Sequence, residues 1–205
     1  MKTKYPSPIF TDLLRLVAYA ISKPLWFIKF KGRENIPAKG SGGFVIVSNH
    51  QTFLDPVWIT LPMRRRRIRF LAFDRAFDWR FLGRFIRYLG AFPVSLDAGG
   101  AVKAMRESVR SLREGSALVV FPEGGRAFID GAMSDFKVGA VRIAARAGVP
   151  ILPVTISGGN QIWPQGQRYP KPFRPVSITY HPPVYLDDRE DAATQTKILR
   201  QIIDC

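Results

Sequence analysis

The stretch Gly43-Phe-Val-Ile-Val-Ser48 is a nearly unbroken run of β-branched and aromatic residues. It shows no alternation of polar and apolar positions, which is typical of a strand buried on both faces of a parallel sheet. Similar apolar runs follow along the chain and predict further strands at residues 68–73, 117–121, 151–156 and 176–180.

Helical patterns lie between these runs. Apolar residues recur at steps of three and four, and a glycine follows where each helix should end. The two sets are Val102, Met105, Val109 and Leu112 before Gly115, and Val138, Val141, Ala144 and Ala145 before Gly148. Alternating strands and helices predict one layered α/β domain over residues 31–205, with a mostly parallel sheet flanked by helices. Segment 158–175, rich in Gly, Pro and Gln, is expected to be a long irregular loop.

The composition of the 205 residues favours one globular domain with an anionic partner. Apolar residues make up 46% of the chain, which excludes a disordered protein. A net charge of +15 favours association with nucleic acid, an anionic bilayer, a phosphorylated molecule or an acidic carrier protein. The one cysteine, Cys205, excludes a disulfide framework or a cysteine zinc cluster within the chain.

Residues 1–30 predict an N-terminal amphipathic helix ahead of the domain. Apolar residues recur there at helical spacing, at Ile9, Leu13, Leu16, Val17, Ala20 and Ile21. Asp12, Arg15 and Lys23 interrupt the apolar stretch 9–30, so we expect neither a transmembrane span nor a signal peptide. The apolar stripe could pack on the protein's own core or lie in a membrane interface.

Histidine chemistry points to one position, since the chain has only His50 and His181. His50 directly follows the strand at 43–48, and in open α/β sheets ligands bind at the carboxyl ends of strands. Asp55 lies five residues further on, close enough for a turn to bring its carboxylate to the imidazole of a general base. The alternative is that Asp55, which precedes Pro56, only caps a helix. His181 precedes two prolines, and we expect a structural role for it.

A second polar turn follows the strand at 117–121, in Phe121-Pro-Glu-Gly-Gly-Arg126. Glycines let a ligand approach the main chain closely, and an arginine fork can hold a phosphate with two hydrogen bonds. The segment therefore predicts an anion clamp. The alternative is a plain glycine turn with solvated charges.

Four segments, in order, resemble the motifs of the glycerophospholipid acyltransferase family, whose type members are 1-acylglycerol-3-phosphate acyltransferases. They are Asn49-His50 with Asp55, Phe121-Pro-Glu-Gly-Gly-Arg126, Phe136-Lys-Val-Gly-Ala140 and Val149-Pro-Ile-Leu-Pro-Val154. The resemblance implies transfer of a fatty acyl group from acyl-CoA or acyl carrier protein to the free hydroxyl of a lysophospholipid. The expected acceptor is 1-acylglycerol-3-phosphate, which would give phosphatidic acid, and neither a metal nor a cofactor is implied.

The resemblance also implies roles for single residues. His50 would be the general base and Asp55 its orienting partner. The substrate-binding set would comprise Asn49, Glu123, Gly124, Gly125, Arg126, Lys137 and Arg75. Family members bind membranes through N-terminal helices, which favours the interfacial alternative for residues 1–30. We therefore expect a peripheral or monotopic enzyme on an anionic membrane surface, at the cytoplasmic face of the membrane.

Departures from the family pattern concern the acceptor. Leu96 stands where the family often has a phosphate-binding Arg, Phe73 stands where members that form phosphatidic acid tend to have Lys, and Gly125 replaces a Thr. Cations of the substrate-binding set could compensate. Alternatively, the acceptor carries a substituted phosphate, as in lysophosphatidylethanolamine.

The basic charge leaves another class open, a non-catalytic protein that binds anionic lipid or nucleic acid. The run from Arg64 to Arg67 is either a solvated face or a contact for anionic lipid or an acidic acyl carrier. Nucleic acid is not expected as a partner, since no helix-turn-helix, zinc or aromatic RNA-binding pattern accompanies the run. A nucleotide-binding enzyme lacks support, because the chain has neither a GxxxxGK loop nor GxGxxG after a strand.

Overall fold

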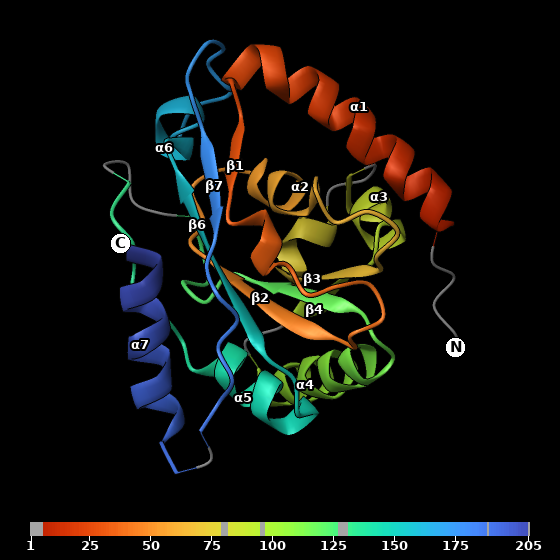
Figure 1. Ribbon diagram of the computed structural model, residues 1–205, viewed down its shortest axis with the longest axis vertical. Helices are drawn as coiled ribbons and strands as arrows, with labels where there is room; N and C mark the ends of the chain where they lie inside the picture. Colours follow the sequence, from red (N-terminus) through yellow and green to blue (C-terminus); the bar gives the residue numbers. More distant parts are fainter. Residues whose placement is uncertain (1–5, 79–81, 95–96, 127–130, 188, 205) are drawn as a thin grey trace.

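The computed structural model describes residues 6–78, 82–94, 97–126, 131–187 and 189–204. These residues form a seven-stranded sheet with the strand order β1-β7-β6-β2-β5-β3-β4 (Figure 1). The strands are β1 (Lys29–Lys31), β2 (Phe44–Ser48), β3 (Ile68–Phe73), β4 (Ala91–Val94), β5 (Ala117–Val120), β6 (Ile151–Ser157) and β7 (Ser177–Tyr180). Neighbouring strands are parallel except β6 and β7, which are antiparallel. The expected mostly parallel sheet is therefore confirmed.

Strand β2 lies inside the sheet, between β5 and β6. All five of its residues are buried, and Ile46 is in register with Val119 of β5 and Leu152 of β6. The unbroken apolar run suits this place because a strand covered on both faces needs apolar side chains on both. The other strands predicted from apolar runs are also present.

Two strands at the edges of the sheet lack a sequence pattern. Strand β1 is only Lys29-Phe-Lys31, and β4 contains Pro93. Short strands with charged residues or proline are typical of sheet edges, where one side of the strand has no partner. Three or four residues are too few to show a period, so these strands were not predicted. Strand β1 also spans the boundary expected between residues 30 and 31.

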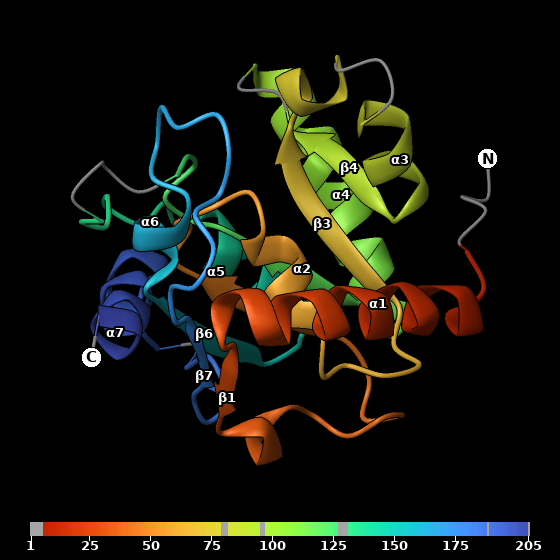
Figure 2. The same ribbon diagram turned by 90° about the horizontal axis from the view of Figure 1, so that it is seen from above.

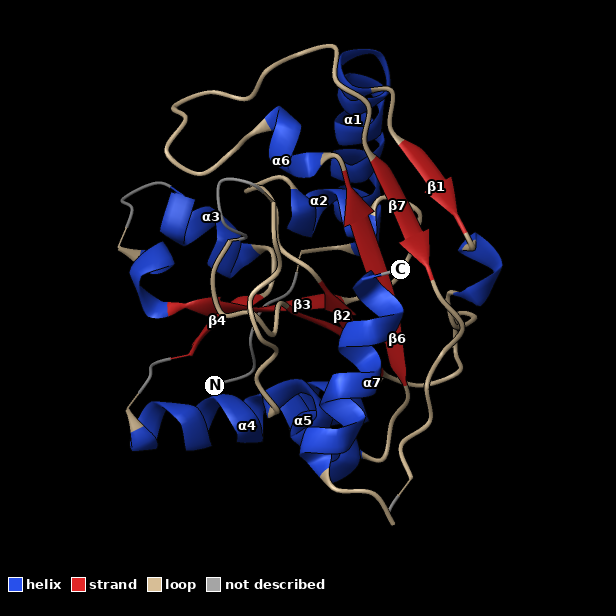
Figure 3. Ribbon diagram, turned by 90° about the vertical axis from the view of Figure 1, so that its left-hand side faces the viewer, coloured by secondary structure: helices blue, strands red, loops and turns tan. Residues whose placement is uncertain are grey.

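Helices cover both faces of the sheet. They are α1 (Pro8–Trp26), α2 (Asp55–Thr60), α3 (Leu82–Tyr88), α4 (Ala98–Arg113), α5 (Gly139–Ala147), α6 (Gly159–Ile162) and α7 (Ala192–Asp204), with 3-10 turns η1 (Arg33–Asn35) and η2 (Asp74–Phe77). Figure 3 shows α4, α5 and α7 on one face and α1, α2, α3 and α6 on the other. Alternate residues of β2 serve the two layers: Val45 and Val47 pack with α4, α5 and α7, while Ile46 packs with α1, α2 and α6.

The predicted ends of α4 and α5 are confirmed. Glycines in the left-handed conformation follow both helices, Gly115 at φ +84° and Gly148 at φ +69°, as is usual at helix ends. Asp97 caps the start of α4 by accepting a hydrogen bond from the Gly100 N–H (3.2 Å). Val102 is an exception to the predicted buried face of α4, because it is 52% exposed.

The N-terminal half of helix α1 contacts the domain through polar side chains. Arg15 donates hydrogen bonds to the carbonyls of Met63 (2.8 Å) and Arg66 (3.2 Å), and the Asp12 carboxylate accepts from the Arg65 N–H (3.0 Å). The predicted apolar stripe faces away from the core, with exposed fractions between 49% and 81% at Ile9, Leu13, Leu16, Val17 and Ile21. The stripe therefore does not pack on the core.

The C-terminal half of α1 is anchored next to α2, as the view from above shows (Figure 2). Trp58 donates from Nε1 to the Ser22 hydroxyl (3.1 Å), and its ring meets Trp26 edge to face with 5.5 Å between centroids. Trp26 and Trp58 both belong to the buried core. Within the described part of the chain, no helix has the length and apolar character needed to cross a bilayer.

Candidate active site

His50 lies in the loop that connects the carboxyl end of β2 to α2. Its Nδ1 is 3.0 Å from Oδ2 of Asp55, the first residue of α2. The His50 side chain is 17% exposed, and the Asp55 side chain is fully buried. The predicted contact between imidazole and carboxylate is confirmed. Leu54, not Asp55, occupies the N-cap position of α2.

The Asp55 carboxylate is held by the turn that precedes it. Oδ2 accepts hydrogen bonds from the main-chain N–H groups of Gln51 (2.6 Å) and Thr52 (2.7 Å), and Oδ1 accepts from the Thr52 hydroxyl (2.7 Å). These bonds close the five-residue turn and fix the carboxylate against His50. Asp55 therefore organises the start of α2 and orients His50 through one set of contacts.

The imidazole of His50 has a defined orientation. With its Nδ1 proton shared with Asp55, the lone pair lies on Nε2. Phe121 stacks on the ring, with 4.1 Å between centroids and 20° between planes. Nε2 has no hydrogen-bond partner among the described residues. It is therefore available to take a proton from a bound hydroxyl group.

Glu123 supports the main chain of this loop. Its Oε1 accepts a hydrogen bond from the His50 N–H (2.7 Å), and its Oε2 accepts from the Ser134 N–H (2.9 Å). Burial raises the pKa of Glu123, while the two hydrogen bonds act in the opposite direction. Both oxygens are engaged with the main chain, and a carboxylate repels a phosphate. These contacts favour a positioning role for Glu123 over the predicted contact with the acceptor.

Asn49 joins the loop that carries His50 to β6. Its Nδ2 donates to the Ile156 carbonyl (2.9 Å), and its Oδ1 accepts from the Ile156 N–H (2.8 Å). Asn49 is only 3% exposed. Both polar atoms of its amide bind the main chain of β6, and the predicted role of Asn49 in substrate binding stays a prediction.

The glycine turn brings two predicted segments together. Gly124 has φ +76°, and a β-carbon there would lie 2.6 Å from Nζ of Lys137. The Lys137 N–H donates to the Pro122 carbonyl (3.0 Å), which holds the second segment against the first. The β-carbon position of Gly125 has no atom within 4 Å, so a threonine would fit there.

Arg126 lies near the pair formed by His50 and Asp55, called the dyad below, and part of its guanidinium is unpaired among the described residues. Its guanidinium carbon is 3.9 Å from the ring centroid of Phe53, which lies in the loop between His50 and Asp55. Burial lowers the pKa of Arg126, and the charge of Asp55 raises it. Nη1 is buried and has no hydrogen-bond partner in the part of the chain that the structure describes. Buried donors are normally paired, so this nitrogen favours an anionic ligand.

The other residues considered for the acceptor site are described in part or not at all. Arg75 belongs to η2 by its main chain, at the end of β3, but its side chain is not described. The side chain of Phe73 and the whole of Leu96 are not described either. The prediction that Arg75 binds substrate therefore stays a prediction.

An aromatic pair beside the dyad was not predicted. Phe53 meets Trp163 edge to face, with 5.3 Å between ring centroids, and Trp163 directly follows α6. The long loop predicted at 158–175 thus begins with a short helix and contributes a ring to the site. Phe53 could have been found from the sequence, because it is an aromatic residue that lies between His50 and Asp55.

His181 is structural, as expected. Its Nε2 is 2.8 Å from the Thr155 hydroxyl, which donates to the Ile203 carbonyl (2.9 Å). Burial lowers the pKa of His181. Among the described residues, no three His, Cys, Asp or Glu side chains group closely enough to hold a metal ion.

Comparison with known sequences shows which family has these features. A family model described as Acyltransferase matches residues 27–157. A chloroplastic 1-acyl-sn-glycerol-3-phosphate acyltransferase of Brassica napus is 31% identical over 163 residues, covering 79% of this chain and 46% of the relative. The 1-acyl-sn-glycerol-3-phosphate acyltransferase of Bacillus subtilis is 26% identical over 86% of both chains. The chain spans about half the length of its chloroplastic relatives.

A solved structure shares the fold. The crystal structure of the 1-acyl-sn-glycerophosphate acyltransferase PlsC of Thermotoga maritima superposes with a TM-score of 0.74 and 27% sequence identity. The match covers 96% of this chain and 77% of that one. The matched family segment contains His50, Asp55, Glu123 and Arg126. From its sequence and its dyad, the chain belongs to the acyltransferase family.

Proposed function

We propose that this protein is a 1-acylglycerol-3-phosphate O-acyltransferase, which moves a fatty acyl group from a thioester donor to the free glycerol hydroxyl and forms phosphatidic acid. The observation that carries the proposal is the 3.0 Å contact between His50 Nδ1 and the buried Asp55 carboxylate, with Nε2 unpaired among the described residues. The named acceptor of the relatives supports the same reaction. The donor is acyl-CoA or acyl carrier protein.

The geometry of the dyad fits direct acyl transfer. His50 Nε2 removes the proton of the acceptor hydroxyl as that oxygen attacks the thioester carbonyl. Asp55 holds the ring and stabilises the imidazolium that forms. The tetrahedral intermediate then breaks its carbon–sulfur bond, and the His50 imidazolium gives the proton to the leaving thiolate, which departs as the thiol. No covalent bond between acyl group and protein is needed.

The acceptor phosphate is assigned to the glycine turn. Arg126 supplies the unpaired Nη1, and Lys137 brings its Nζ to Gly124. A cation fork and an ammonium beside a half-buried glycine suit a phosphate monoester. The acceptor with a substituted phosphate, as in lysophosphatidylethanolamine, is the alternative outcome of the assay below.

We infer that α1 attaches the enzyme to the membrane that holds its substrates. The helix turns Asp12 and Arg15 inward and its apolar stripe outward, which is the reverse of a helix that packs on a core. The apolar surface continues onto α3, because Phe10 meets Tyr88 with 6.0 Å between ring centroids. Exposed apolar surface of this kind suits an interfacial helix.

An acyl-transfer assay tests the function. Purified protein is offered a panel of lysolipids with acyl-CoA and with acyl carrier protein, and His50→Ala is compared with His181→Ala as the matched control. His50→Ala should lose about 1,000-fold or more of kcat because the general base is gone, while His181→Ala should keep its turnover. Near wild-type transfer by His50→Ala would contradict the assignment. Absence of transfer from both donors in the wild type would favour the non-catalytic alternative.

Vesicle flotation tests the role of α1. Replacing Ile9 and Leu16 by Ser together should weaken binding to vesicles about tenfold or more, since each buried aliphatic side chain contributes about 1.5–3 kcal/mol. The control replaces Val102 of α4 and Ile198 of α7, which are also exposed but lie on the other face of the sheet. Equal losses in the two double variants would contradict the proposal.

A further inference from the structure

A cavity of about 490 Å³ lies at the amino ends of the strands, away from the dyad of His50 and Asp55 at their carboxyl ends. Two segments line it, one within residues 33–39 and one within residues 62–66. These segments precede β2 and β3, so the cavity lies at the amino ends of strands whose carboxyl ends face the catalytic loop. It is therefore separate from the site of acyl transfer.

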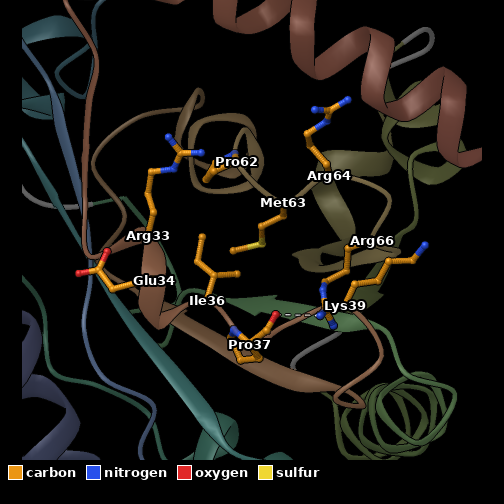
Figure 4. A pocket seen from close by; sticks show the side chains of 9 residues that line it. All are labelled: Arg33, Glu34, Ile36, Pro37, Lys39, Pro62, Met63, Arg64 and Arg66. Atoms are coloured by element: carbon orange, nitrogen blue, oxygen red, sulfur yellow. Dashed lines mark hydrogen bonds between the residues drawn. The ribbon is translucent and has the colours of Figure 1, made fainter.

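Cations surround the opening of this cavity. Figure 4 shows Arg33, Arg64 and Lys39 around its margin, and none of the three forms an ion pair with a described residue. Glu34 is the one acidic residue of the lining, and its carboxylate points away from the other lining side chains (Figure 4). The margin thus presents positive charge that the fold does not neutralise.

The walls of the cavity are held by an arginine that the fold has fully engaged. Arg66 is buried and donates hydrogen bonds to the carbonyls of Gly42 (3.1 Å) and Pro37 (2.9 Å). Its guanidinium also lies 4.8 Å from the ring centroid of Phe44. These contacts hold the segment before β2 against the segment before β3. Because Arg66 is engaged in these contacts, the cations at the margin are the ones left to bind a ligand.

The cavity is also connected directly to α1. The carbonyls of Met63 and Arg66 accept hydrogen bonds from Arg15, on the inner side of α1. The outer side of the same helix carries the exposed apolar stripe. Between the marginal cations, Ile36 and Met63 form an apolar floor (Figure 4). Cations around an apolar floor, next to an exposed apolar helix, match an amphiphile with an anionic headgroup.

We propose that this cavity binds the phosphate headgroup of an anionic phospholipid of the bilayer on which α1 rests. Arg33, Lys39 and Arg64 contact the phosphate, while Ile36 and Met63 contact the glycerol backbone. The cavity accommodates one headgroup and is too small for a helix of an acidic carrier protein. This inference rests on the proposed membrane attachment of α1, and it adds a site that selects anionic lipid independently of the catalytic centre.

Vesicle binding separates this site from general charge attraction. The variant Lys39→Gln with Arg64→Gln is compared with Lys103→Gln and Arg142→Gln, exposed cations of α4 and α5 that change the net charge equally. The cavity variant should lose about 10- to 30-fold in affinity for vesicles with phosphatidylglycerol, and the control under about twofold. Both should bind phosphatidylcholine vesicles like the wild type. Equal losses in the two variants would overturn the proposal.

Methyl resonances of methionine locate the ligand. The chain has four methionines; Met63 lies in the cavity floor, and Met133 lines a separate cavity beside Asn49. Titration of the full chain, labelled with ¹³C-methyl methionine, with monomeric dihexanoyl phosphatidylglycerol should shift the Met63 signal. Dihexanoyl phosphatidylcholine and inorganic phosphate should leave that signal in place.

Two outcomes of this titration overturn the proposal. A shift confined to the Met133 signal would place the lipid on the side of the dyad. A Met63 shift with inorganic phosphate as large as that with the lipid would indicate a general anion site. Acyl transfer by the Lys39 and Arg64 variant in detergent should equal that of the wild type. A failure of the proposed function would show instead in the His50 assay, with the Met63 shift unaffected.

Discussion

The carboxyl ends of the parallel strands form one side of the sheet, the carboxyl edge, and their amino ends form the opposite side, the amino edge. Charged side chains of opposite sign fix main-chain segments at these two edges. At the carboxyl edge, the carboxylates of Asp55 and Glu123 accept main-chain N–H groups and fix His50. At the amino edge, the guanidinium groups of Arg15 and Arg66 donate to main-chain carbonyls and fix the walls of the cavity. In both places the charged groups bind the backbone, and Arg15, which is half-buried, also pairs with Asp12 (2.9 Å).

The edges differ in the cations left over for ligands. Arg126 at the carboxyl edge is stacked on Phe53 and partly buried, whereas Arg64 at the amino edge is exposed. Salt screens the charge of an exposed cation more strongly than that of a partly buried one, so a contact between one anion and one exposed cation is weaker. The net charge of +15 therefore includes partly buried arginines such as Arg126 and exposed arginines such as Arg64. Substituting one kind at a time distinguishes their effects.

The largest expected effect is at the buried carboxylate of the catalytic edge. Asp55→Asn should lower kcat for acyl transfer about 1,000- to 10,000-fold, because an amide cannot hold the required tautomer of His50 or stabilise its charged form. Asp12→Asn is the matched change at the other edge and should keep kcat within a few-fold. Steady-state kinetics at saturating acceptor measure both. Comparable losses in both variants would show that the two edges do not differ in function.

A smaller effect is expected at Arg126. Arg126→Gln should raise KM for 1-acylglycerol-3-phosphate about 10- to 100-fold, since a hydrogen bond to a charged group contributes about 1.5–3 kcal/mol. Arg64→Gln should leave this KM unchanged when the substrate is presented in detergent micelles. With 1-acylglycerol, which lacks the phosphate, Arg126→Gln and the wild type should not differ. A rise of KM for that acceptor too would place Arg126 outside the phosphate site.

The smallest effect concerns the pH dependence of stability. Burial raises the pKa of Glu123 above its ordinary value of 4.5, so the folded protein holds this proton to a higher pH than the unfolded chain does. The free energy of unfolding therefore falls as the pH rises from 4.5 through the folded pKa, by about 1.4 kcal/mol at most for each unit of difference. Glu123→Gln removes this fall.

Urea unfolding between pH 4 and pH 8 measures this dependence of the free energy of unfolding on pH. The stability of Glu123→Gln relative to the wild type should improve as the pH rises through this window. Glu190→Gln, at an exposed position, is the control and should keep the wild-type pH dependence. Parallel curves for Glu123→Gln and the wild type would contradict the assigned pKa direction.

The pattern of apolar residues in the sequence predicts the central strands and their helices, but not the outer strands β1 and β4. Strand β2 and the helices that end at Gly115 and Gly148 carry patterns long enough to recognise, whereas β1 and β4 are short. Strand β1 also pairs with β7, a strand far along the chain, with Lys29 in register with Ser177. The same limit holds at the site. The contact between His50 and Asp55 is predictable because a local turn closes it.

Contacts between segments that are far apart in the sequence could not be predicted from it. Phe53 and Trp163 meet only because α6 follows β6 at the same edge of the sheet. The orientation of the α1 stripe was also undecided, since one helical pattern suits a core and a membrane equally. Only the inward contacts of Asp12 and Arg15 distinguish the two.

The clamp between Asn49 and Ile156 has a consequence for synthesis of the chain. The two residues are 107 positions apart, so the catalytic loop reaches its final geometry only after β6 has been made. At about 5–20 residues per second, this takes roughly 5 to 20 s after His50 leaves the peptidyl transferase centre. Helix α1 ends at Trp26 and is complete long before. A nascent chain therefore completes the helix with the exposed apolar stripe before it completes the geometry around His50.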